Sequence, residues 1–109
     1  RTLEKAKQQC SDITQDLQIS ASDGSVKSLQ KRIQLYKQMQ EVWKKALPAA
    51  EGIEGGGPLL PPEIEQVAPD LVEKYMMASS ETKPKLACEA IDRCIKELQK
   101  RLAAAKKAG

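Results

Sequence analysis

The chain has 109 residues, a net charge of +3, and 40% hydrophobic, 30% charged and only 3% aromatic residues. A chain of this length can bury one hydrophobic core, which must be mainly aliphatic because phenylalanine is absent. The scarcity of β-branched and aromatic residues disfavours β-sheets and predicts an all-α protein. The chain also lacks histidine, which removes the usual general base at neutral pH and the commonest metal ligand, so most hydrolytic and transfer chemistries are disfavoured.

The first two predicted elements are amphipathic helices over about residues 2–18 and about residues 26–47. In each, apolar residues recur at helical spacing, so they share one face of the helix. The first stripe is Leu3, Ala6, Cys10, Ile13 and Leu17, and the second is Leu29, Ile33, Tyr36, Met39, Trp43 and Leu47. Turn-forming residues lie between them, and Ser25 is positioned to cap the second helix. Because this connection is short, we expect the helices to pack antiparallel.

A segment rich in glycine and proline follows the second helix. Residues 48–62 contain four of the six glycines and four of the six prolines, so we expect a crossover loop over about residues 48–61. Its glycine run lacks the Lys-Ser/Thr of a phosphate-binding loop. Residues 58–62 contain a PxxP spacing that an SH3-type groove could bind, although a strap that packs its leucines on the bundle is the simpler expectation.

Two further helical segments complete the chain. A short acidic helix is predicted over about residues 62–78, broken near residue 69 because an interior proline removes a backbone hydrogen bond. A last helix is predicted over about residues 83–106, with the stripe Ala87, Ile91, Cys94, Leu98 and Leu102. The expected fold is one domain over 1–109, a small, largely antiparallel bundle of three to four helices with the Gly/Pro-rich crossover before the short third helix.

The cysteines and the apolar runs indicate the setting of the protein. Cys10, Cys88 and Cys94 are odd in number and widely spaced, which predicts free thiols in a reducing, intracellular compartment, cytoplasmic or nuclear. No apolar run approaches the roughly 18 residues that a membrane span needs. Because CxxC pairs and nucleotide-binding glycine motifs are also absent, we expect no metal, no cofactor and no enzymatic activity.

The best candidate partner-binding surface is the short third helix, which has apolar residues on more than one face. One face can pack inside while the other is offered to a partner helix, although burial of a short helix on two sides produces the same pattern. The candidate residues are Leu71, Val72, Tyr75, Met76 and Met77. We therefore expect a non-catalytic adaptor or scaffold module of a larger intracellular protein, which binds a helical or extended peptide through an apolar groove.

Two alternatives come from other features of the sequence. A basic cluster on the last helix and further basic residues on the second helix could dock on nucleic acid or on an acidic protein surface, although a solvated face is their ordinary role. The cluster is Lys96, Lys100, Arg101, Lys106 and Lys107, and the second helix adds Lys27, Lys31, Arg32, Lys44 and Lys45. The heptad-like stripes could instead zip between copies and form a homo-oligomer. Modification at Ser79, Ser80 or Thr82 is left open.

Overall fold

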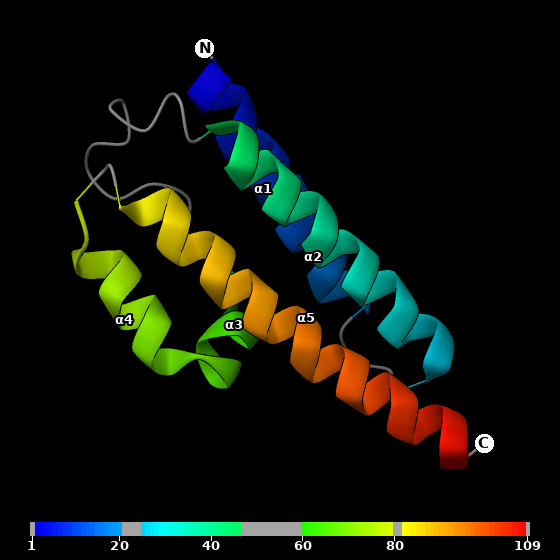
Figure 1. Ribbon diagram of the computed structural model, residues 1–109. Coiled ribbons are helices and arrows are strands. Elements are labelled where there is room, and N and C mark those ends of the chain that lie inside the picture. The colour runs from blue at the N-terminus through cyan, green and yellow to red at the C-terminus, as the bar shows by residue number, and fades with distance from the viewer. Residues whose placement is uncertain (1, 21–24, 47–59, 80–81, 109) are drawn as a thin grey trace.

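The computed structural model describes five helices and no strand within residues 2–20, 25–46, 60–79 and 82–108 (Figure 1). The helices are α1 (Thr2–Ser20), α2 (Val26–Ala46), α3 (Pro62–Val67), α4 (Pro69–Met77) and α5 (Lys83–Ala108). The predicted all-α fold class is therefore confirmed for the described residues. They form five helices rather than three or four, because two separate helices occupy the region of the predicted short third helix.

The three long helices run side by side, with α2 between α1 and α5 and antiparallel to both (Figure 1). The short helices α3 and α4 pack against α5 and against each other. Among the described residues, no Cα atom of α1 lies within 8 Å of one in α3, α4 or α5. The bundle therefore has four positions around its core, α1, α2, α5 and the α3–α4 pair, and α1 meets the α3–α4 pair across a seam in which no Cα atoms come within 8 Å.

Side chains of the predicted stripes meet in one core. The buried members include Cys10, Ile13, Leu17, Leu29, Ile33, Tyr36, Met39, Trp43, Ala87, Ile91, Cys94 and Leu98. The ring of Trp43 meets Tyr75 of α4 edge to face, with centroids 5.8 Å apart, an arrangement that aromatic pairs prefer. Gln40 donates from Nε2 to the carbonyl of Cys88 at 3.1 Å, which ties α2 to α5 beside this core.

Prolines and a serine determine where several helices begin. Pro62 and Pro69 are the first residues of α3 and α4, where a missing N–H costs no hydrogen bond. Ala68, just before Pro69, has φ −136° and ψ 63°, because a residue that precedes proline is pushed out of the helical region. At α2, the backbone N–H of Ser28 donates to Ser25 Oγ at 3.2 Å, the cap that the sequence suggested.

Lys83 joins the end of α4 to the start of α5. It is only 5% exposed, and its Nζ donates to the carbonyls of Tyr75 at 2.7 Å and Met76 at 3.3 Å. The ammonium also lies 4.8 Å from the centre of the Tyr75 ring. A cation at a helix C-terminus satisfies carbonyls that have no partner in the helix and complements the helix dipole. Lys83 therefore stabilises the docking of α4 on α5.

Part of the predicted organisation lies outside the described residues. Of the predicted crossover over 48–61, only Leu60 and Pro61 are described: Leu60 packs against the core, and Pro61 is buried. Leu47 and Ser80 are likewise outside the described residues. In the part of the chain that the structure describes, no helix combines the length and the apolar character needed to cross a membrane.

Candidate functional site

The structure divides the five residues predicted to bind a partner into two groups. Leu71, Val72 and Tyr75 are 6%, 7% and 3% exposed and belong to the core, whereas Met76 and Met77 are 66% and 82% exposed. α4 is rich in apolar residues mainly because one of its faces is buried against α5 and the core. Consecutive residues of a helix project about 100° apart, so the two methionines do not form one continuous patch.

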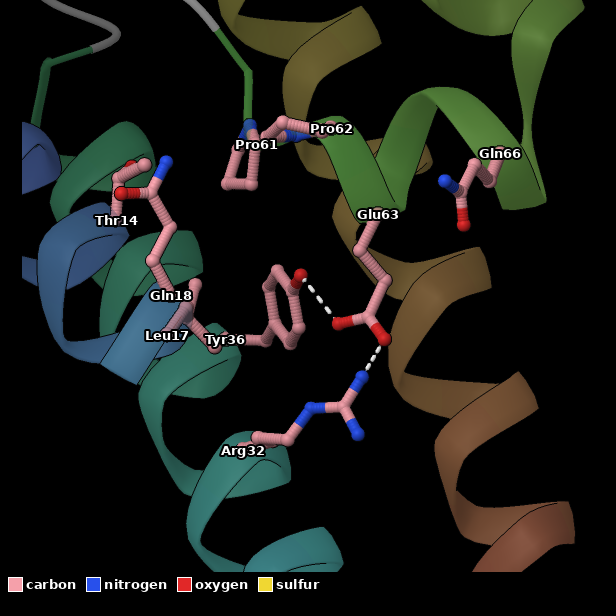
Figure 2. Close-up of a pocket in the computed structure, with 9 residues that line it drawn as sticks. All are labelled: Thr14, Leu17, Gln18, Arg32, Tyr36, Pro61, Pro62, Glu63 and Gln66. Carbon is pink, nitrogen blue, oxygen red and sulfur yellow. Dashed lines mark hydrogen bonds and ion pairs between the residues drawn. The ribbon is translucent and has the colours of Figure 1, made fainter. Parts of the chain in front are cut away.

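A groove occupies the seam between α1 and α3. It has a volume of about 260 Å³, and Figure 2 shows side chains of α1 on one side, side chains of α3 and its preceding proline on the other, and two residues of α2 at the floor. The lining residues are Thr14, Leu17, Gln18, Arg32, Tyr36, Pro61, Pro62, Glu63 and Gln66. The groove exists because the short helix α3 packs on α5 and does not close on α1.

Three polar residues form a connected group at the floor of the groove. Glu63 of α3 accepts a hydrogen bond from the hydroxyl of Tyr36 at 2.7 Å through Oε1, and its Oε2 forms an ion pair with Nη2 of Arg32 (Figure 2). The side chains of Arg32 and Glu63 are 7% and 20% exposed. Both carboxylate oxygens of Glu63 are therefore engaged, and its charge is compensated next to the groove. Arg32 Nε is buried and has no hydrogen-bond partner among the described residues.

Burial favours the protonated forms of the cysteines and of Tyr36. Burial raises the pKa of the Cys10 and Cys94 thiols from 9.0 to about 11, and burial also raises the pKa of the half-buried Cys88 thiol. Burial, followed by the neighbouring Cys94 thiol, raises the pKa of the Tyr36 hydroxyl. Tyr36 thus remains a hydrogen-bond donor to Glu63, and thiols that keep their proton are weak nucleophiles.

The predicted basic residues of α5 all lie at the surface. Lys96, Lys100, Arg101, Lys106 and Lys107 are exposed, and two of them form ion pairs within α5. Lys96 lies 3.1 Å from Asp92, and Arg101 lies 3.5 Å from Glu97. These five residues are therefore available to solvent, and two of them are partly neutralised.

On α2, the structure separates Arg32 from the other predicted basic residues. Lys27, Lys31, Lys44 and Lys45 are exposed, whereas Arg32 is buried against Glu63. The helical spacing contains a signal for this difference, because Arg32 lies one turn before Tyr36 and beside Ile33 on the buried side. The sequence contains no comparable signal that Glu63 would be its partner.

Within the described residues, no group of three or more cysteine, aspartate or glutamate side chains is arranged to hold a metal ion. In comparisons with protein-family models, curated proteins and solved structures, no match to this chain was found.

Proposed function

We propose that this chain is a non-catalytic protein-interaction module, an adaptor or scaffold domain, and that it binds an extended peptide of a partner in the groove between α1 and α3. The observation that carries the proposal is the groove itself, in which the apolar side chains of Leu17 and Pro61 at the walls and Tyr36 at the floor lie beside polar side chains. Peptide-binding domains seat a segment by combining apolar pockets for its side chains with hydrogen bonds to its main chain, and this lining offers groups of both kinds.

The size and charge of the groove favour a peptide over a cofactor. Its volume of about 260 Å³ lies at the lower edge of the range of about 300–1,000 Å³ that is usual for small-molecule and cofactor sites, so it fits one side chain of a peptide better than a large cofactor. Because Arg32 neutralises Glu63 at the floor, the groove favours an uncharged occupant. Gln18 and Gln66 are exposed on opposite sides, and their amides can donate to and accept from a peptide main chain. We therefore expect a neutral segment with one apolar side chain directed into the groove.

The chemistry of the titratable groups supports binding rather than catalysis. The Glu63 carboxylate already accepts from Tyr36 and Arg32, which makes it a weak general base. Cys10 and Cys94 keep their protons at neutral pH because burial raises the pKa of each to about 11. The free thiols also support an intracellular setting, cytoplasmic or nuclear.

The proposal is tested by selecting peptides from a random phage-displayed library and titrating the selected synthetic peptides into the ¹⁵N-labelled chain. We expect amide shifts centred on Thr14, Gln18 and Gln66. Gln18→Arg should weaken binding at least about tenfold, because a charge in a neutral groove must be desolvated when the peptide covers it.

A matched variant separates the groove from the rest of the surface. Gln15→Arg places the same charge on another exposed position of α1, and it should leave affinity within about twofold. If the selected peptides bind the Gln18→Arg variant normally but do not bind the Met77→Lys variant, the binding site lies on α4 and the proposal is overturned. A library that yields no binder would overturn it as well.

Self-association stays a second, separate proposal. In this proposal the apolar stripes zip between copies, and because they pack against one another within one chain, the helices would have to exchange between copies. Sedimentation at micromolar concentration tests this proposal, and a monomer mass would refute it.

A further inference from the structure

One side of the bundle is built from the two most basic helices. α2 carries six basic residues against one acidic residue, and α5 carries eight against three, so each has a net charge of +5. The other three helices together carry three basic and seven acidic residues. α2 and α5 pack side by side (Figure 1), and we call the exposed surface where these two basic helices adjoin the α2–α5 face. The positive charge of the described helices is therefore concentrated on α2 and α5.

The lysines of this face are mostly free to meet a partner. Within the described residues, nine exposed lysines of α2 and α5 have no carboxylate within 4.0 Å. They are Lys27, Lys31, Lys37, Lys44, Lys45, Lys85, Lys100, Lys106 and Lys107. Lys31 and Lys45 share the helical stripe of Gln38, which lines a hollow with α1, whereas Lys37 and Lys44 lie on the side of Gln40, which bonds to α5. The lysines of α5 span about 33 Å at a rise of 1.5 Å per residue, which is long enough to meet several phosphates of one duplex, whose charges are about 3.4 Å apart along each strand.

We propose that the α2–α5 face binds duplex nucleic acid through its phosphate backbone, without reading the base sequence. Lysine binds phosphate as a point charge and needs no fixed geometry, whereas the exposed arginines Arg93 and Arg101 are already paired with Asp70 and Glu97. Each lysine that contacts a phosphate releases condensed counterions, and this release drives binding that depends on salt and not on sequence. This function is independent of the peptide groove, which lies across the core on the α1–α3 side.

Other polyanionic partners fit the same face less well. Protein interfaces are depleted in lysine and enriched in aromatic residues, and Tyr36, Trp43 and Tyr75 are all buried. Single-stranded nucleic acids bind by stacking their bases on exposed aromatic rings, and the described surface exposes no such ring because Tyr36, Trp43 and Tyr75 are buried. Stable anchoring on an anionic membrane adds apolar side chains to the electrostatic attraction of lysines, but the large exposed apolar side chains of the described residues are Ile19, Met76 and Met77, on α1 and α4.

The test uses the full chain and a fluorescent DNA duplex of about 25 base pairs, with binding followed by anisotropy. If about five lysines contact phosphates at once, the slope of log K against log salt is about −4.5, and affinity falls about 500-fold between about 50 and about 200 mM salt. Two duplexes of unrelated sequence should bind equally. The triple variant Lys37→Gln, Lys44→Gln and Lys85→Gln should reduce the magnitude of the slope by up to about 3.

A control variant with the same loss of charge separates this face from net charge alone. Lys5→Gln, Lys7→Gln and Lys74→Gln removes three exposed lysines from α1 and α4, and it should leave the slope unchanged. Equal losses in the two triple variants would overturn the proposal, as would the absence of binding at about 50 mM salt. Tighter binding to a single strand, to vesicles with phosphatidylserine or to polyglutamate than to the duplex would also overturn it.

Discussion

Replacing Glu63 with glutamine removes the negative charge that compensates the buried guanidinium of Arg32. Breaking a buried ion pair by removing one partner costs about 3–5 kcal/mol, because the other charge is left in a medium of low dielectric. The Glu63 side chain is 20% exposed, and glutamine still offers Tyr36 an acceptor, so we expect a loss of about 2–3 kcal/mol. For a chain of this length the melting temperature should fall by about 10 °C.

Urea unfolding measures this loss, with far-ultraviolet circular dichroism and the fluorescence of Trp43, which is buried in the native core, as probes. Glu65→Gln is the matched control, because Glu65 is exposed on the same helix and its loss should change stability by less than about 0.5 kcal/mol. Adding Arg32→Met to Glu63→Gln should recover most of the stability, because the stranded charge is then removed as well. The reasoning is refuted if Glu63→Gln lowers the free energy of unfolding no more than Glu65→Gln does. It is also refuted if the effects of Arg32→Met and Glu63→Gln on the free energy of unfolding simply add in the double variant.

The remaining predictions concern the core and its thiols. Ile91 is fully buried, so Ile91→Ala should destabilise the chain by about 2–5 kcal/mol in the same urea titration, and a cost below about 1 kcal/mol would show that the site is not packed as described. Iodoacetamide near pH 8, followed by mass spectrometry, should alkylate half-buried Cys88 first, whereas Cys10 and Cys94 should react only on unfolding; early labelling of either would contradict their burial. Because burial raises the pKa of Cys10 and Cys94 from 9.0 to about 11, their contribution to stability is complete below about pH 9 and is lost as the pH rises through about 11. The urea midpoint should therefore fall over this range, and a constant midpoint would exclude the effect.

The candidate groove illustrates why a functional site of this kind is hard to find in a sequence. Gln18 and Gln66 are ordinary surface residues in their own helices, and only the packing of α3 on α5 leaves them on opposite sides of one groove. Arg32 was detectable as a charge on a buried face, because it lies one turn before Tyr36. The role of its partner Glu63 could not be detected in the sequence, because acidic residues in the first turn of a helix are usually explained by the helix dipole.

The sequence alone determined the all-α class, because low aromatic content and apolar spacings of three and four residues are local properties that need no knowledge of the partner helix. It also indicated that Pro69 interrupts the acidic helix, since a proline acts on its own turn and on the residue before it. The tertiary structure alone decided that Tyr75 packs against Trp43 while Met76 and Met77 remain exposed, and that Arg32 pairs with Glu63. These contacts join residues about 30 positions apart, and helical periodicity specifies which face is apolar but not which element covers it.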